Sequence, residues 1–235
     1  MGAGGMSAAL FTDRREAGRR LAMALGRFAG DAPLILALPR GGVPVAYEVA
    51  ASLHAPLDLL LVRKIGAPGH EEYGIGAVID GADPQLVLNE DVVRMLAPSP
   101  DYIRTEMHRQ VAELERRRRA YLGEREPPSL AGRTVIVVDD GIATGGTMRA
   151  ALRGARKAAP ERLVLAVPVA PADTLDTLRD ECDEVVCLAT PEPFHAVGVW
   201  YANFNQTDDD EVRTLLHHAE RQLATATHHP ARGDG

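Results

Sequence analysis

Residues 135–147 read Val-Ile-Val-Val-Asp-Asp-Gly-Ile-Ala-Thr-Gly-Gly-Thr and carry the strongest structural signal in the chain. The first four are β-branched and apolar, a pattern typical of a strand buried on both faces of a parallel sheet. Two carboxylates, Asp139 and Asp140, end this strand, and a loop rich in Gly and Thr leads into a helix predicted over 148–157. The stretch therefore predicts a strand–loop–helix unit with two acids at the carboxyl end of the strand.

The loop of this unit has the composition of a phosphate-binding site. In an open α/β sheet, ligands bind where a strand meets the next helix, since free backbone N–H groups and the helix dipole favour an anion there. Glycines let the backbone approach a phosphate closely, and threonines add hydroxyl donors. The loop residues are Gly141, Ala143, Thr144, Gly145, Gly146 and Thr147. Because Asp139 and Asp140 would repel a bare phosphate, they favour a phosphorylated sugar whose hydroxyl groups donate to them.

Two further strand ends are expected to lie beside this unit. A short apolar strand over 34–38 runs into Arg40, Gly41 and Gly42, and a strand over 57–62 ends in Arg63 and Lys64. Since the carboxyl ends of parallel strands meet at one edge of a sheet, the three loops should line one site. Their charges suit a ligand with an anionic group at each end and hydroxyl groups in the middle.

The segment between 62 and 133 departs from the simple alternation of strand and helix. Residues 65–76 contain four glycines and predict a long flexible loop, a kind of segment that often serves as an active-site lid. The runs 75–79 and 85–88 predict a hairpin, and helices are predicted over 89–96 and 101–122. The basic run Arg116–Arg119 of the second helix favours a solvated helix face over a nucleic-acid patch, because Glu residues surround it.

The remaining pattern completes an α/β fold. We expect a mainly parallel sheet flanked by helices on both faces, with a small flap and a long inserted helix, and one domain over 8–224 between flexible tails at 1–7 and 225–235. The aromatic segment 194–204 fits either stacking on a flat base or packing of a C-terminal flap onto the sheet. Further strands are predicted over 163–169 and 184–188, and further helices over 172–180 and 208–223.

Composition excludes several classes of partner and compartment. The formal net charge of the 235 residues is −7, which argues against nucleic acid, because such binding needs clustered Lys and Arg. Cys182 and Cys187 have no metal-ligand partners nearby in the sequence and are expected to be reduced thiols. No apolar run approaches membrane-spanning length, and residues 1–6 lack the features of a signal peptide. We therefore expect a cytoplasmic protein that does not act on membranes.

With these loops described, the sequence resembles the type I phosphoribosyltransferases. Their signature is an apolar strand, two acidic residues and a Thr-Gly-Gly-Thr-type loop that binds phosphoribosyl diphosphate, and residues 135–147 match it along their whole length. The resemblance extends more loosely over about 34–199. It implies a parallel-sheet fold, phosphoribosyl diphosphate as substrate, a base as acceptor, and a Mg²⁺ ion carried by the substrate's diphosphate and ribose hydroxyls. The family often forms dimers, so a homodimer is an open possibility.

The resemblance also implies roles for particular residues. Asp139 and Asp140 would bind the ribose hydroxyls, and the loop Ala143–Thr147 the 5′-phosphate. Arg40 and Gly41 fall where the family contacts the diphosphate, often through a strained or cis peptide. Arg63 and Lys64 fall at the start of the family's flexible catalytic loop.

Two details bear on the acceptor base. Ala143 occupies a position where hypoxanthine–guanine enzymes usually carry an Asp, so the motif looks closer to adenine phosphoribosyltransferases. In those, a Glu-Tyr-Gly triplet of the flexible loop supplies a carboxyl group near the base, which makes Glu72 the candidate proton donor or acceptor. The loop is shorter than in adenine enzymes and the helix over 101–122 has no counterpart there, so the base stays open. A regulator that senses phosphoribosyl diphosphate or nucleotides on the same fold is the alternative function.

Overall fold

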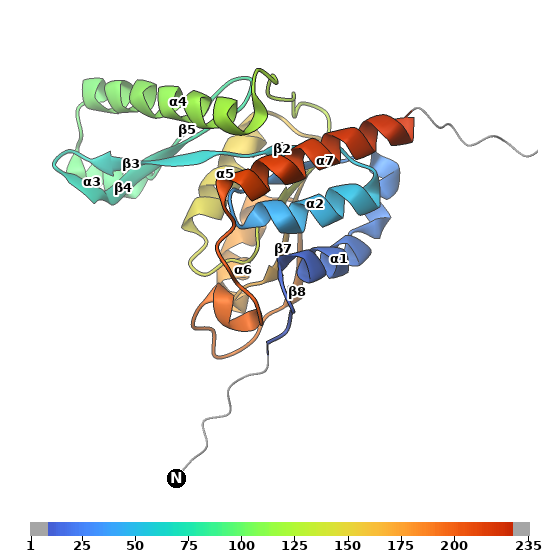
Figure 1. Cartoon of the computed structure of the whole chain (residues 1–235). Coiled ribbons are helices and arrows are strands. Elements are labelled where there is room, and N and C mark those ends of the chain that lie inside the picture. The colour runs from blue at the N-terminus through green and yellow to red at the C-terminus, as the bar shows by residue number, and fades with distance from the viewer. Residues whose placement is uncertain (1–8, 228–235) are drawn as a thin grey trace, which may run out of the picture.

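A five-stranded parallel sheet forms the body of the protein (Figure 1). The computed structural model describes residues 9–227, apart from the side chains of 70–73, 226 and 227. The sheet has the order β2-β1-β6-β7-β8, and every neighbouring pair is parallel. This confirms the predicted fold class. The strands are β1 (Leu34–Ala37), β2 (Leu57–Leu59), β6 (Thr134–Val138), β7 (Arg162–Val169) and β8 (Glu184–Ala189).

Helices cover both faces of this sheet, as the hydrophobic pattern predicted. Alternate strand side chains point to opposite faces: Ile136 and Val138 join the core on one face, and Val135 and Val137 the core on the other. All five residues of β6 are buried, which is why its sequence is continuously apolar. On the first face lie α1 (Arg14–Ala24), α2 (Gly42–Leu53) and α7 (Asp209–Thr227), and on the second α5 (Gly146–Lys157) and α6 (Ala172–Leu178).

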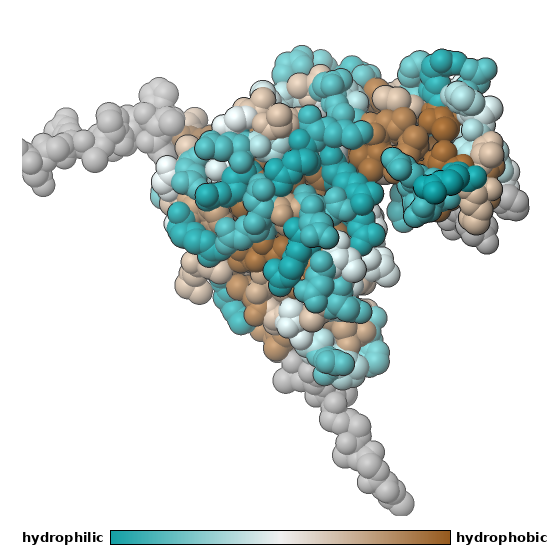
Figure 2. Space-filling model, turned by 180° about the vertical axis from the view of Figure 1, so that it is seen from behind, coloured by the Kyte–Doolittle hydropathy of each residue, from teal (hydrophilic) through white to brown (hydrophobic). Residues whose placement is uncertain are grey.

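Residues 62–122 form a second unit, which we call the arm, and which projects from the body in Figure 1. Its antiparallel sheet has the order β3-β4-β5, and the long helix α4 lies along it. The predicted hairpin and both predicted helices are confirmed. From behind, the arm stands apart from the body and apolar residues gather on it (Figure 2). Its elements are β3 (Val62–Ala67), β4 (His70–Ile79), β5 (Gln85–Leu88), α3 (Glu90–Leu96) and α4 (Pro100–Leu122).

The long loop predicted over 65–76 is wrong, because β3 and β4 pair across it. Gly76 is needed where β4 pairs with β5. A Cβ at Gly76 would overlap the backbone oxygen of Val87 on the neighbouring strand, whereas Ile65 and Ile75 bury their side chains completely. The predicted strand over 57–62 is also divided, since β2 ends at Leu59 and β3 begins at Val62. Arg63 and Lys64 therefore lie inside an arm strand and not at the end of a body strand.

The C-terminal part of the described chain packs onto the body. Trp200 and Tyr201 are 4% and 5% exposed and form a small core with Phe11 of the N-terminal segment. Of the two interpretations of the aromatic segment, packing is therefore the one that the structure supports for these two rings. The helix α7 continues to Thr227, so the first three residues of the predicted tail 225–235 are helical. Short 3₁₀ turns complete the chain: η1 (Gly26–Asp31), η2 (Arg179–Glu181) and η3 (Val197–Trp200).

Two sequence expectations concern cysteines and membranes. Cys182 and Cys187 are both free thiols, the first buried and the second half-buried. Burial raises the pKa of each thiol, which keeps both in the neutral, unreactive form. Within residues 9–227, none of the helices combines the length and the apolar character that a membrane span requires.

Candidate active site

The loop between β6 and α5 opens to solvent at the carboxyl edge of the sheet. Gly145 precedes α5 with a φ of 75°, a conformation that L side chains rarely adopt. A Cβ at Gly141 would lie 2.5 Å from Val197 Cγ1, so this part of the loop is tightly packed. By contrast Ala143, Thr144, Gly146 and Thr147 are exposed. The loop thus offers backbone N–H groups, two hydroxyls and the start of a twelve-residue helix to an anion in solvent.

The loop between β1 and α2 lies directly against the acid pair. Strands β1 and β6 are neighbours in the sheet, with Ala37 beside Val138, so their carboxyl ends meet. A Cβ at Gly41 would overlap the Asp140 carboxylate, and one at Gly42 would lie 2.8 Å from the Val138 oxygen. Glycine is required at both positions by this close approach. The peptide between Pro39 and Arg40 is cis, as the resemblance implied for this loop.

The Arg40 side chain reaches toward the start of α7. Its Nη1 lies 3.6 Å from Asp209 Oδ1, and the Tyr121 hydroxyl at the end of α4 donates to the same oxygen at 2.7 Å. This contact joins the predicted diphosphate loop to the arm. With 39% of its side chain exposed, Arg40 remains accessible to a ligand.

The environment of Asp139 and Asp140 disfavours the state in which both carboxylates are ionised. Burial, and then the neighbouring Asp140, raise the pKa of Asp139 well above its usual range. Burial also raises the pKa of Asp140, but the Arg14 guanidinium opposes that rise. The Asp140 backbone N–H donates to Asp139 Oδ1 at 2.8 Å, and the Tyr201 hydroxyl donates to the Asp140 carbonyl at 2.5 Å. Arg14 therefore distinguishes the two acids and favours the ionised form of Asp140.

Sequence reasoning missed Arg14 and Tyr201 as neighbours of the acid pair. Arg14 Nε lies 2.7 Å from Asp140 Oδ2, although 126 residues separate them in the chain. Arg14 is one of several arginines on α1, and nothing in the local sequence marks it. The sequence predicts Tyr201 only as part of an aromatic segment that stacks or packs, whereas in the structure its hydroxyl group contacts the acid loop.

The predicted cations of the arm point in different directions. Neighbouring residues of a strand face opposite sides, so Arg63 and Lys64 cannot both point to the same side of β3. Arg63 Nε donates to Gln110 Oε1 of α4 at 2.9 Å, whereas Lys64 is exposed. The backbone of Glu72 belongs to β4, but its side chain lies outside the described residues. The catalytic roles of these three residues stay predictions.

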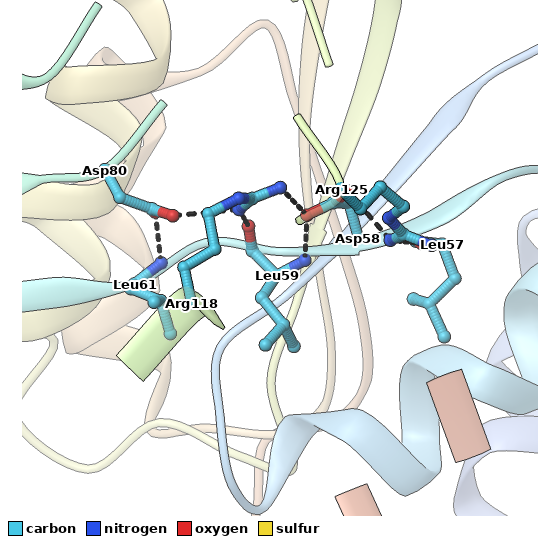
Figure 3. Close-up of polar contacts among 7 residues, drawn as sticks. All are labelled: Leu57, Asp58, Leu59, Leu61, Asp80, Arg118 and Arg125. Atoms are coloured by element: carbon cyan, nitrogen blue, oxygen red, sulfur yellow. Dashed lines mark hydrogen bonds and ion pairs between the residues drawn. The ribbon is translucent and has the colours of Figure 1, made fainter. Parts of the chain in front are cut away.

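A buried ionic network fixes the arm to the body (Figure 3). Arg118 of α4 lies between two carboxylates, with its Nη2 2.6 Å from Asp58 Oδ1 and its Nη1 2.9 Å from Asp80 Oδ2. Arg125 contacts the other oxygen of Asp58 at 2.8 Å. Asp58 belongs to β2 and Asp80 follows β4, so this network joins α4 and the end of β4 to the edge strand of the body sheet. Beside it lies a cavity of about 220 Å³ that contains neither Asp139 nor Asp140 in its lining.

No group of three or more His, Cys, Asp or Glu side chains among the described residues could hold a metal ion. Two adjacent carboxylates, Asp139 and Asp140, directly precede the exposed loop.

The fold and the loop geometry together are those of a phosphoribosyl transferase. The family model described as "Phosphoribosyl transferase domain" matches residues 15–202, which include both glycine loops, the acid pair and the arm. The chain belongs to this family.

Individual relatives agree with this assignment. Two proteins of Mycobacterium tuberculosis, "Putative phosphoribosyl transferase Rv0571c" from strain H37Rv and "Putative phosphoribosyl transferase MT0597" from strain CDC 1551, are each 48% identical over 217 residues. Those residues are 92% of this chain and 48% of each relative, so the chain spans about half the length of the curated relatives it matches. The crystal structure of TT1426 from Thermus thermophilus superposes with a TM-score of 0.76 at 43% identity, covering 88% of this chain and 97% of that one.

Proposed function

We propose that this protein transfers 5-phosphoribose from phosphoribosyl diphosphate to a nitrogenous base and releases pyrophosphate in a Mg²⁺-dependent reaction. One observation carries the proposal. The acids Asp139 and Asp140 lie between an exposed Gly/Thr loop at the start of α5 and the Arg40-Gly41-Gly42 loop, which contacts both acids. The order of these three features is that of the groups in phosphoribosyl diphosphate. The Gly/Thr loop would match the 5′-phosphate, the two acids the ribose hydroxyls, and the Arg40 loop the diphosphate.

Each loop would bind one part of the substrate. The 5′-phosphate would accept hydrogen bonds from the backbone and hydroxyls of 143–147, and Gly141 would let the chain turn away beneath it. The ribose hydroxyls would donate to Asp139 and Asp140. The diphosphate would lie against Arg40, Gly41 and Gly42.

The chemistry would then depend on charge. Breaking the bond between C1′ and the diphosphate oxygen builds positive charge on the ribose and negative charge on the leaving group, while the base nitrogen bonds to C1′ and loses a proton. The Arg40 side chain would stabilise the leaving diphosphate, and the sequence predicts the same role for Arg63 or Lys64, whose side chains leave β3 on opposite sides. Mg²⁺, bound to the diphosphate and to the ribose hydroxyls, would neutralise the same charge.

The acceptor is proposed only as a nitrogenous base. Ala143 has no acidic group to assist a purine of the hypoxanthine type, and Glu72 in the arm is the candidate proton donor or acceptor instead. A base that needs proton transfer at a ring nitrogen would suit a carboxyl group there.

The test is a panel of purine and pyrimidine bases with phosphoribosyl diphosphate and Mg²⁺, followed by pyrophosphate detection and mass spectrometry of the nucleotide. We expect release with one base or a small group of bases, and loss of release when EDTA is added. Tight binding of phosphoribosyl diphosphate without release for any base would favour the alternative, a regulator that senses this ligand. Neither binding nor release would reject both functions.

A further inference from the structure

Arg14 makes three contacts that hold its guanidinium against the acid pair. Nε lies 2.7 Å from Asp140 Oδ2, Nη1 donates to the Asn205 carbonyl at 2.6 Å, and Cζ lies 3.8 Å from the centre of the Phe204 ring. The residue is the first of α1, and Asp13 caps that helix by accepting from the Glu16 N–H at 2.8 Å. The backbone and the head group of Arg14 are therefore both fixed.

This ion pair differs from the others on the same helix. The side chains of Arg14 and Asp140 are 11% and 13% exposed, whereas the side chain of Arg15, which pairs with Glu48, is 43% exposed. Exposed pairs contribute little because water screens them, but a cation beside a buried carboxylate strongly favours its ionised form. The contact with Arg14 should thus control the charge of Asp140.

The Arg14 side chain contacts one oxygen of Asp140. Oδ2 accepts from Arg14 Nε and lies against Gly41, whereas no side chain of the described residues donates to Oδ1. Arg14 is the cation beside the carboxylate; the other titratable groups that face it are Asp139 on its own loop and Tyr201 from the aromatic segment, with Glu16 of α1 nearby. Of these groups only Arg14 favours a negative charge on Asp140.

We propose that Arg14 is a positioning residue of the sugar site, which holds Asp140 ionised and turned so that Oδ1 accepts a hydrogen bond from a ribose hydroxyl. The inference rests on the proposed function for the identity of the sugar. Arg14 lies immediately before the residues that the family model matches, and its partners Phe204 and Asn205 lie two and three residues after the last of them. The positioning contact thus comes from outside the matched region.

The direction of the pH effect follows from the charges. Burial raises the pKa of Asp140 and Arg14 opposes the rise, so removing the guanidinium must raise that pKa further. Ribose binding needs the ionised carboxylate as acceptor, and affinity should therefore increase as the pH passes through the Asp140 pKa. In Arg14→Met this increase should occur about one pH unit or more higher than in the wild type.

The experiment measures binding of phosphoribosyl diphosphate–Mg²⁺ and of inorganic diphosphate–Mg²⁺ by calorimetry between pH 5 and 9. The variants are Arg14→Met, Arg14→Lys and the matched control Arg15→Met, which removes an arginine from the same helix that also contacts a carboxylate and a ring. The ligands also have groups that titrate between pH 5 and 9. Their contribution is the same for every variant and cancels when the variants are compared. In parallel, ¹³C NMR follows the Asp carboxyl groups, with Asp140 assigned through Asp140→Asn.

We expect Arg14→Met to weaken phosphoribosyl diphosphate about tenfold or more at neutral pH, to regain affinity at high pH, and to bind inorganic diphosphate as the wild type does. Arg14→Lys should restore most of the affinity, and Arg15→Met should change neither ligand. Equal weakening of both ligands at every pH would overturn the inference, as would an Asp140 titration unchanged in Arg14→Met. A wild type that binds inorganic diphosphate but not phosphoribosyl diphosphate would reject the proposed function, while the carboxyl titration would still decide the role of Arg14.

Discussion

Replacing Arg118 by Met tests how the arm is held to the body. Arg118 and Asp58 are 7% and 4% exposed, and the Arg118 guanidinium neutralises both Asp58 and Asp80. Removing one partner of a buried ion pair leaves an uncompensated charge and costs about 3–5 kcal/mol. Arg125 still contacts Asp58 in the variant, so we expect a loss of unfolding free energy near 3 kcal/mol, at the lower end of that range.

Asp80 should behave differently from Arg118. Burial outweighs the attraction to Arg118 and raises the pKa of Asp80 from 3.8 to about 6. That difference corresponds to about 3 kcal/mol, the net cost of ionising Asp80 in the folded protein at pH 8. Asp80→Asn removes this cost and keeps an oxygen for the Leu61 N–H, which now donates to Asp80 Oδ1 at 2.6 Å. The pKa of about 6 already includes the attraction to Arg118, so we expect Asp80→Asn to gain up to about 3 kcal/mol of unfolding free energy at pH 8.

The unfolding free energies of the Asp80 and Arg118 variants should change with pH in opposite directions relative to the wild type. Because the folded pKa of Asp80 lies above the unfolded value, the stability it contributes is full below about pH 4 and is lost as the pH rises through about 6. The unfolding free energy of Asp80→Asn relative to the wild type should therefore increase from pH 5 to pH 8. Arg118→Met should be most destabilised at pH 8, where both carboxylates must carry charge.

The assay is urea unfolding at pH 5 and pH 8, with thermal unfolding as a second measure. Arg119→Met is the matched control, since Arg119 is the next residue of α4 but is 63% exposed and lies 3.8 Å from Glu124. It should change stability by less than about 0.5 kcal/mol. For a chain of this length, the Arg118→Met loss should lower the Tm by about 10 °C. The reasoning is refuted if Asp80→Asn destabilises as much as Arg118→Met, or if Arg118→Met matches Arg119→Met.

Three other predictions concern the sugar site and the arm. Asp140→Asn should abolish pyrophosphate release while the Tm stays within a few degrees, and full activity would remove its role in ribose binding. Glu72→Gln should slow transfer much more than it weakens phosphoribosyl diphosphate binding; an unchanged rate would make Glu72 an ordinary arm residue. Gly41→Ala should weaken the same ligand about tenfold or more, because the new Cβ overlaps the Asp140 carboxylate, whereas Gly30→Ala, where nothing lies within 4 Å, should bind normally. Equal affinities in the two glycine variants would show that this close approach is not needed.

The sequence predicted the body of the fold more accurately than the arm. Strands such as β6 are buried on both faces, and their composition alone identifies them. The arm strands β3 and β4 contain glycines and polar residues, and one of these glycines, Gly76, lies close to the Val87 backbone of the neighbouring strand β5. Glycine in a strand is indistinguishable from glycine in a loop until the neighbouring strand is known.

The acid pair, the Gly/Thr loop and the Arg40-Gly41-Gly42 loop were all recognisable in the sequence, because each is a short run at the end of an apolar strand and parallel strands end at one edge. Tertiary structure alone decided which cation meets which acid. Arg14 reaches Asp140 across 126 residues, and Arg118 reaches Asp58 across 60. Such pairings follow from how α1 and α4 pack. The sequence of an arginine-rich helix does not show which of its arginines will be buried. Local sequence patterns therefore identified the residues of the proposed sugar site, and long-range packing determined the charges around them.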